Sequence, residues 1–283
     1  MLCDMHTHSS FSPDADRDAS IEAMAEKARD LGLGHITVTD HCDCNFWHRQ
    51  DEFDYPEYQL PDSMMFGARD YALESITKVN EAKNRYPRLL CGIELGQPLQ
   101  APEAAACITS LDGLDFIIGS LHMNEGRPDF YWIDYSKLSR EEIDTILYDY
   151  FDEILRMCLN CDFDVLGHLT YPLRYIVGDH GISVDMEKYG EKIENIFKAL
   201  IERGKGIEIN TSGLRQKYGK TLPDLDLIKL YRSLGGEIIT LGSDAHRISD
   251  IGAGLTEGAE LARQAGFSYT AVFKNRKPKF ISL

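Results

Sequence analysis

Histidine and carboxylate side chains stand at the ends of short apolar runs throughout this sequence. The first run ends in Asp4-Met5-His6-Thr7-His8, and later runs end in Asp40-His41, Glu94, His122, His168 and Asp244-Ala245-His246. Side chains two residues apart on a strand point the same way, so His6 and His8 can bind one ion. Imidazole and carboxylate donors without thiolates suit Zn, Mn, Fe or Co and do not identify the metal. The pattern predicts one site for several metal ions that acts on phosphate esters.

The runs that carry these residues alternate with amphipathic helical patterns, which is typical of repeated βα units around a parallel sheet. Strands are predicted over residues 2–5, 35–39, 89–94, 115–119, 165–167, 206–209, 237–241 and 269–273. Ser20 is expected to cap a helix, and Ser139 with Glu142 forms a capping box before another. In a closed parallel barrel the carboxyl ends of the strands converge on one face, so ligands far apart in sequence would meet there.

Length and composition suit one large α/β domain spanning residues 1–283, because barrels of this size commonly form a single core. The chain has 46 acidic and 30 basic residues and a formal net charge of -16, which would repel nucleic acid. No apolar stretch approaches the roughly 20 residues that a membrane span needs. Seven cysteines, an odd number without a secretory signal, indicate reduced thiols. We therefore expect a cytoplasmic protein with no nucleic-acid or membrane partner and of undetermined oligomeric state.

Six short motifs follow one another along the chain. They are Asp4-Met5-His6-Thr7-His8, Thr39-Asp40-His41, Gly92-Ile93-Glu94, Gly119-Ser120-Leu121-His122, Gly167-His168 and Gly242-Ser243-Asp244-Ala245-His246. Each is weak by itself, but in this order the set is specific and resembles the polymerase and histidinol phosphatase (PHP) domain family, in particular its histidinol-phosphate phosphatase branch. The resemblance covers the whole chain. It implies a distorted (β/α)7 barrel, similar to a TIM barrel, with three divalent metal ions at the carboxyl-terminal face of the strands.

The resemblance also implies which residues bind the three ions. The first ion would be held by His6, His8, Glu94 and Asp244, the second by Glu94, His122 and His168, and the third by Asp14, His41 and His246. Many relatives have histidine where this chain has Asp14, which follows Pro13 and could instead serve a turn or a cap. His41 and His246 could instead orient other ligands, and that is the role expected of Asp40.

Two arginines after predicted strands point to a phosphate. Arg174 ends the segment Gly167-His168-Leu169-Thr170-Tyr171-Pro172-Leu173-Arg174, and Arg215 ends Asn210-Thr211-Ser212-Gly213-Leu214-Arg215. Both segments resemble the phosphatase branch of the family. Guanidinium groups present forked donors that match phosphate oxygens, so Arg174 and Arg215 could clamp a terminal phosphate. A surface salt bridge is the alternative role.

Two further segments carry charge. The stretch after the second predicted strand contains acidic and aromatic residues that would suit the ammonium and imidazole of histidinol phosphate, or could simply be solvated. They are Asp43, Trp47, Asp51, Glu52, Asp54, Tyr55 and Tyr58. The tail contains Lys274, Arg276, Lys277 and Lys279 and is expected to be a solvated end.

The expected reaction is hydrolysis of a small phosphomonoester, which by the resemblance is L-histidinol phosphate, to L-histidinol and phosphate in histidine biosynthesis. Two ions sharing Glu94 would lower the pKa of a bridging water, and the resulting hydroxide would attack phosphorus. The third ion and the two arginines would neutralise the phosphoryl oxygens. Glu94, Asp244 and His246 are the expected catalytic residues, with Asp244 accepting the proton of the nucleophile. The sequence assigns no residue to protonate the leaving group.

Three other functions stay open. A PHP phosphoesterase of broader specificity, such as a nucleotide or phosphodiester hydrolase, would require a basic groove if it acted on nucleic acid. An amidohydrolase-type enzyme would be favoured by a lysine at the end of the fourth predicted strand, which here runs into Gly119-Ser120-Leu121-His122. A metal-holding interaction module without catalysis would be expected to lack some of the ligands.

Overall fold

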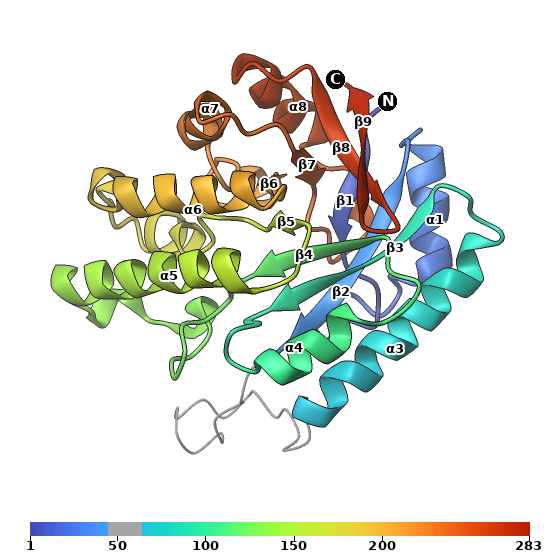
Figure 1. Ribbon diagram of the computed structural model, residues 1–283, viewed down its shortest axis with the longest axis horizontal. Coiled ribbons are helices and arrows are strands. Elements are labelled where there is room, and N and C mark those ends of the chain that lie inside the picture. Colours follow the sequence, from blue (N-terminus) through green and yellow to red (C-terminus); the bar gives the residue numbers. More distant parts are fainter. Residues whose placement is uncertain (45–63) are drawn as a thin grey trace.

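Seven parallel strands form one sheet in which each strand pairs with the next along the chain (Figure 1). The computed structural model describes residues 1–44 and 64–283. The strands are β1 (Asp4–Thr7), β2 (Ile36–Asp43), β3 (Leu89–Gly96), β4 (Phe116–Ser120), β5 (Val165–Leu166), β6 (Gly206–Asn210) and β7 (Ile239–Gly242). Thr7 pairs with Ala245 just beyond the end of β7, so the first and last strands meet and the barrel is nearly closed. The predicted distorted (β/α)7 barrel is confirmed.

The connecting helices lie on the outside of the barrel (Figure 1). They are α1 (Ile21–Asp30), α3 (Met64–Lys83), α4 (Pro102–Thr109), α5 (Arg140–Asn160), α6 (Gly190–Glu202), α7 (Leu225–Ser233) and α8 (Leu255–Gln264). Both predicted caps are present: Oγ of Ser20 accepts the amide of Ala23 at the start of α1 (3.2 Å). The capping box of Ser139 and Glu142 begins α5. No helix within the described ranges combines the length and the apolar character that crossing a membrane requires.

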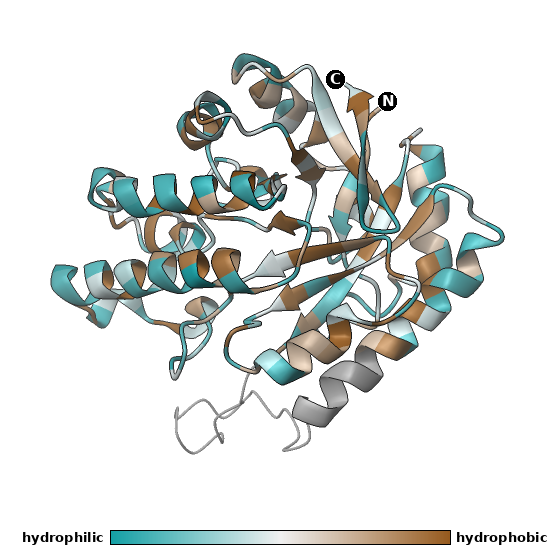
Figure 2. Ribbon diagram, viewed as in Figure 1, coloured by the Kyte–Doolittle hydropathy of each residue, from teal (hydrophilic) through white to brown (hydrophobic). Residues whose placement is uncertain are grey.

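The inside of the barrel changes from apolar to polar along the strands. Because strand side chains alternate with period two, Leu90 and Glu94 share the inner face of β3, and Phe116 and Ser120 share that of β4. An apolar cluster fills the half of the interior at the amino ends of the strands. It consists of Cys3, Met5, Leu90, Phe116, Ile118, Val165, Ala271, Val272 and Phe273. Figure 2 shows apolar strands at the centre and hydrophilic outer faces on the helices around them. The polar carboxyl ends of the strands form the other half of the interior.

A hairpin of β8 (Tyr269–Lys274) and β9 (Lys277–Ser282) closes the barrel at the amino ends of the strands. The expectation that the basic tail is a solvated end is wrong for Arg276, whose Nε lies 2.6 Å from Oδ2 of Asp164. The turn of the hairpin causes this, because Asn275 and Arg276 have φ of 50° and 60° and so direct the chain back across the barrel. Lys274, Lys277 and Lys279 are exposed as expected.

Replacing Arg276 with alanine should destabilise the protein, because the carboxylate of Asp164, which is 8% exposed, would lose its charged partner. Breaking a buried ion pair costs about 3–5 kcal/mol, and partial exposure of Arg276 reduces this, so we expect a loss of about 2 kcal/mol in the free energy of unfolding. Urea unfolding measures the difference. Lys279→Ala, at an exposed position on β9, is the control and should change the free energy by less than about 0.5 kcal/mol. Equal stability of the two variants would contradict the role of Arg276.

Candidate metal centre

The candidate ligands gather at the carboxyl end of the barrel. His6, His41 and Glu94 lie on β1, β2 and β3. The others lie in segments that follow a strand, with His8 and Asp14 after β1, His122 after β4, His168 after β5, and Asp244 and His246 after β7. The side chains of His41, His246 and Asp14 are 17%, 27% and 59% exposed, and the other six are buried. All nine predicted ligands therefore lie at one end of the barrel.

The carboxylate of Glu94 lies at the centre of the cluster. Its Oε1 lies 2.7 Å from Nε2 of His168 and 3.1 Å from Nε2 of His122. Its Oε2 lies 3.4 Å from Nε2 of His6 and 3.5 Å from Nε2 of His8. Burial would raise the pKa of Glu94, but the charges of His6 and His122 hold this pKa well below its ordinary value. An ionised carboxylate whose two oxygens face two groups of imidazoles is suited to bridge two cations.

Two groups of ligand atoms flank this central carboxylate. On one side, Nε2 of His6 and Nε2 of His8 are 3.1 Å apart, and Oδ1 of Asp244 lies 3.7 and 3.5 Å from them. On the other side, Nε2 of His122 and Nε2 of His168 are 3.4 Å apart. The ligand atoms of His6, His8 and Asp244 lie within 4.8 Å of one another. The same holds for the ligand atoms of Glu94, His122 and His168. These groups coincide with the sets that the family resemblance implied for the first and second ions.

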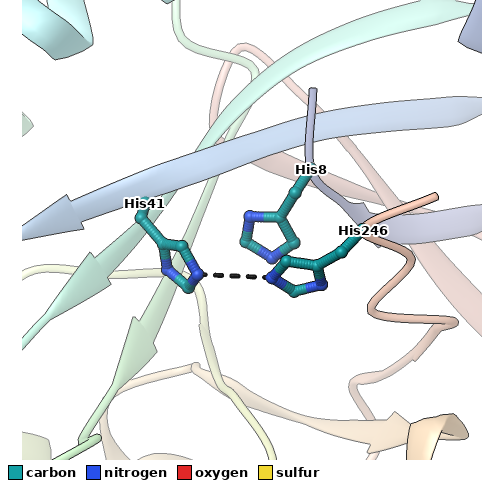
Figure 3. Close-up of side chains that lie close together, drawn as sticks. All are labelled: His8, His41 and His246. Carbon is teal, nitrogen blue, oxygen red and sulfur yellow. Dashed lines mark hydrogen bonds between the residues drawn. The ribbon is translucent and has the colours of Figure 1, made fainter. Parts of the chain in front are cut away.

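The third predicted set, Asp14, His41 and His246, also lies together. Nε2 of His41 and Nε2 of His246 are 3.4 Å apart, and Oδ2 of Asp14 lies 3.4 and 3.2 Å from these nitrogens. Figure 3 shows the rings of His8, His41 and His246 directed toward one another, and their ligand atoms lie within 4.8 Å. Both the buried His8 and the exposed Asp14 therefore lie close enough to join His41 and His246 in binding a third ion.

The spacing of these donors fits shared cations. Two imidazole nitrogens bound to one tetrahedral ion at about 2.0–2.1 Å stand roughly 3.3 Å apart, and the three facing Nε2 pairs are 3.1, 3.4 and 3.4 Å apart. Oε2 of Glu94 and Nδ1 of His41 are buried and lie 2.8 Å apart, at ion-pair distance but without hydrogen-bond geometry. Buried polar atoms without hydrogen bonds are costly, so a cation that took up this capacity would stabilise the cluster.

The turn after β7 directs the side chains of Asp244 and His246 toward different histidines. Asp244 has a φ of 53°, a left-handed conformation that is uncommon for a non-glycine residue. Its amide donates to the carbonyl of His6 (2.8 Å), which holds the turn against β1. As a result, the carboxylate of Asp244 faces His6 and His8, while the imidazole of His246 faces His41. Backbone strain of this kind is concentrated at functional sites.

Both predicted phosphate-binding arginines lie beside Asp244. Nη2 of Arg174 donates to Oγ of Ser212 (2.6 Å) and to Oδ2 of Asp244 (3.3 Å). Nε of Arg174 is buried and has no hydrogen-bond partner. Nη2 of Arg215 donates to the backbone carbonyl of Asp244 (3.0 Å), and its Nε also lies 3.4 Å from Oδ2 of Asp250. The two positive groups thus border the cluster, and Arg174 keeps a donor available for an anion.

Hydrogen bonds from polar neighbours hold the ligands in place. Asp40, which was expected to orient a ligand histidine, accepts a hydrogen bond from Oγ of Ser12 (3.0 Å), and this Oγ lies 3.0 Å from Nδ1 of His8. Ser120 donates to Oε1 of Glu94 (2.7 Å). Asp40 is therefore linked to the imidazole of His8 through the hydroxyl group of Ser12.

Two carboxylates that are not among the predicted ligands also contact ligand imidazoles. Oε1 of Glu208, on β6, lies 2.7 Å from Nδ1 of His6, and Oδ1 of Asp43 lies 3.5 Å from Nδ1 of His122. The alternation in Gly206-Ile207-Glu208-Ile209-Asn210 was a visible sign that Glu208 faces the interior. Asp43 belongs to the acidic and aromatic segment, whose other named residues lie outside the described residues. These are Trp47, Asp51, Glu52, Asp54, Tyr55 and Tyr58.

Without a cation, the cluster retains protons. Burial would lower the pKa of His122, but the carboxylates of Glu94 and Asp43 raise it to about 10. Burial acts in the same direction on His41, and Asp14 and Glu94 nevertheless raise its pKa well above the ordinary value. At neutral pH these two imidazoles therefore carry protons that a cation must displace in order to bind.

A family model for the PHP domain matches residues 4–212. The chain belongs to the PHP domain family. The matched span contains seven of the nine candidate ligands of this PHP domain protein and also Arg174, while Arg215, Asp244 and His246 follow it.

Relatives match this PHP domain protein over nearly their whole length. A protein of Thermotoga maritima named "Probable histidinol-phosphatase" is 29% identical over 272 residues, which are 96% of this chain and 95% of that protein. A protein of Clostridium acetobutylicum with the same name is 25% identical over 283 residues, 99% of this chain and 100% of that protein. In fold, the chain is similar to the crystal structure of histidinol phosphate phosphatase from Lactococcus lactis complexed with zinc, L-histidinol and phosphate. The TM-score is 0.75 at 24% identity, and 98% of each chain is covered.

Cation binding should release protons from this cluster. The pKa of His122 is about 10 and that of His41 is well above its ordinary value, so both are protonated at pH 7 in the metal-free protein, whereas coordination needs the neutral imidazole. Titrating the metal-free protein with Zn²⁺ should therefore give heats that depend on the ionisation enthalpy of the buffer, and the apparent affinity should rise as the pH increases toward 10. Heats that are the same in all buffers would contradict this.

Proposed function

We propose that this PHP domain protein is a metal-dependent histidinol phosphatase, which hydrolyses L-histidinol phosphate to L-histidinol and phosphate. The observation that carries the proposal is a buried cluster of imidazoles and carboxylates that adjoins two guanidinium groups. Imidazoles and carboxylates bind divalent cations, and guanidinium groups bind phosphate. The full-length relatives are named for this activity, and the structural neighbour from Lactococcus lactis holds zinc, L-histidinol and phosphate.

The nine candidate ligands are proposed to hold three divalent cations. The assignment is the one that the family resemblance implies, and the distances among these atoms support it: His6, His8, Glu94 and Asp244 for the first, Glu94, His122 and His168 for the second, and Asp14, His41 and His246 for the third. Nitrogen and oxygen donors of this kind do not select among Zn, Mn and Fe. When bound, such cations supply Lewis acidity toward phosphoryl oxygens and make water a stronger acid.

Arg174 and Arg215 are proposed to bind the phosphate. Ser212 and Asp244 fix the guanidinium of Arg174 through Nη2, which leaves its Nε free to donate. The side chain of Arg174 is only 11% exposed, so its charge is screened less than that of a surface arginine. Negative charge grows on the phosphoryl oxygens in the transition state, and positive groups that are already in place stabilise it there.

Asp244 is proposed to accept the proton of the attacking water. Burial would raise the pKa of Asp244, but the charge of His6 and its other neighbours holds it well below the ordinary value, so the carboxylate is ionised at neutral pH. Arg174, Asn210 and Ser212 all donate to Oδ2 of Asp244, so Oδ1, which faces His6 and His8, would both bind the first cation and receive the proton. Glu94 and His246 complete the proposed catalytic residues. Glu94 lies at the centre of the ligand sets, and Nδ1 of His246 lies 3.6 Å from Oδ1 of Asp244 at the partly exposed rim.

A carboxylate near the rim is proposed to bind the cationic part of the substrate. Asp129 precedes Phe130, whose amide donates to the carbonyl of His122 (3.0 Å), so this segment lies against the cluster. Burial raises the pKa of Asp129 to about 6, although the charge of His122 opposes this. An ammonium group nearby would favour the ionised form of this carboxylate. Asp129 could thereby distinguish L-histidinol phosphate from phosphomonoesters without a positive charge.

We also propose that residues 1–283 act as a single domain in the cytoplasm on a small molecule. The seven cysteines all lie within the described residues and form no disulfide, as in proteins of a reducing compartment. The net charge of -16 disfavours nucleic acid as a partner.

A panel of substrates tests the proposed activity. Protein supplied with Zn²⁺, Mn²⁺ or Fe²⁺ should release phosphate from L-histidinol phosphate, and more slowly from a phosphomonoester that lacks a positive charge. Glu94→Gln should lower kcat/KM by at least about 100-fold, because it removes a charge at the centre of all the ligand sets. Asp129→Asn should raise KM for L-histidinol phosphate about fivefold, the equivalent of about 1 kcal/mol for a partly screened ion pair.

The phosphomonoester that lacks a positive charge serves as the matched control, because Asp129→Asn should not change its KM. Preferred cleavage of a phosphodiester or of an amide by the wild-type protein would contradict the proposed activity. Equal rates for all phosphomonoesters would contradict the assignment of L-histidinol phosphate and leave a phosphatase of broader specificity.

A further inference from the structure

Glu208 contacts two ligand sets at once. Its side chain lies on β6 and is completely buried. Oε1 lies 2.7 Å from Nδ1 of His6. Oε2 accepts the backbone amide of His168 (2.9 Å) and the side-chain amide of Asn210 (3.2 Å). One carboxylate therefore links a histidine of the first proposed set with a histidine of the second.

The contact with His6 determines which nitrogen faces the other ligands. A carboxylate only accepts, so the hydrogen bond requires a proton on Nδ1 and leaves Nε2 of His6 as the ligand atom. This Nε2 lies 3.1 Å from Nε2 of His8 and 3.4 Å from Oε2 of Glu94. A carboxylate that holds the far nitrogen of a ligand histidine in this way sets the orientation and the basicity of the ring.

A glycine on the neighbouring strand makes room for this contact. An ideal Cβ on Gly242, at the end of β7, would lie 2.1 Å from Oε1 of Glu208 and 2.5 Å from Cβ of His6. Any side chain at residue 242 would therefore push the carboxylate and the imidazole apart. Both oxygens of Glu208 are already engaged, and Glu208 is in none of the groups of clustered ligand atoms found among the described residues. It is thus placed behind the ligands and does not join them.

We propose that Glu208 is a positioning residue that keeps the proton of His6 on Nδ1 and, through the amide of His168, holds the first two cation subsites at a fixed spacing. This inference rests on the proposed function of the cluster as a cation site. A glutamine side chain has one accepting atom, so Glu208→Gln can accept from Nδ1–H of His6 or from the amide of His168, but not from both. The NH2 of the glutamine then faces the other N–H donor, and Glu94 is shared by the two proposed sets. Both subsites should therefore weaken together, although neither loses a ligand.

Zinc binding by the full chain tests this role without any substrate. Metal-free wild-type and Glu208→Gln proteins are titrated with Zn²⁺ in competition with a chelating dye, and circular dichroism verifies that the variant is folded. Two of the ions should bind about 10- to 100-fold more weakly to the variant, the usual effect of removing a partner behind a ligand histidine. Glu153→Gln is the matched control, because this buried glutamate also accepts a side-chain amide and a backbone amide, from Gln100 and Glu125. It should bind Zn²⁺ as the wild-type protein does.

Nitrogen-15 NMR of the zinc-loaded wild-type protein gives a second reading that does not depend on the variant. His6 should carry its proton on Nδ1 and bind zinc through Nε2. Zinc bound through Nδ1 of His6 would overturn the inference, and so would a folded Glu208→Gln protein that binds every ion as tightly as wild type or weakens only one. A wild-type protein that binds zinc but does not hydrolyse L-histidinol phosphate would refute the proposed function and leave the role of Glu208 standing.

Discussion

Burial of carboxylates among imidazoles, at the mouth of the barrel, is the constraint on which the other features of the site depend. Removing an ionised carboxylate from water costs several kcal/mol unless opposite charges and hydrogen bonds compensate for it. Glu94 and Asp244 are 1% and 7% exposed. Imidazoles surround both, and Arg174 adds a positive charge next to Asp244. Protons can supply the remaining compensation in the metal-free protein, and divalent cations would supply it in the working enzyme.

Such a cluster needs a rigid support, and the two halves of the barrel divide this task. The half at the amino ends of the strands is packed with apolar side chains and closed by the hairpin of β8 and β9. Glycines let neighbouring elements approach closely near the site: an ideal Cβ on Gly119 would lie 2.6 Å from the ring of Phe163. Ligands that project from strands packed in this way have little freedom to move apart. The mouth can therefore hold ligands from six strands in one cluster.

Much of this arrangement could be predicted from the sequence, because it follows from two general rules. The side chains of a strand alternate, so the His6 and His8 spacing already indicated a shared ion. Parallel barrels bring the carboxyl ends of their strands together, so Glu94, His122 and His168 were expected to meet. Both rules depend only on local patterns and on chain order.

Contacts that depend on register and rotamer could not be predicted in the same way. His6 and Glu208 are 202 residues apart, and Asp164 and Arg276 are 112 residues apart. Nothing in the local pattern of either member selects its partner. Strand β9 was missed because its residues Lys277–Ser282 are mostly exposed and include Pro278, so they lack the apolar alternation that marks a strand.

Anomalous X-ray scattering from crystals loaded with Zn²⁺ or Mn²⁺ tests the shared cation cluster most directly. We expect separate peaks on the two sides of the Glu94 carboxylate, each within about 2.0–2.2 Å of its imidazole nitrogens, and a third peak next to His41 and His246. Loaded crystals with no anomalous peak at the carboxyl end of the barrel, or with ions bound only elsewhere on the molecule, would contradict it.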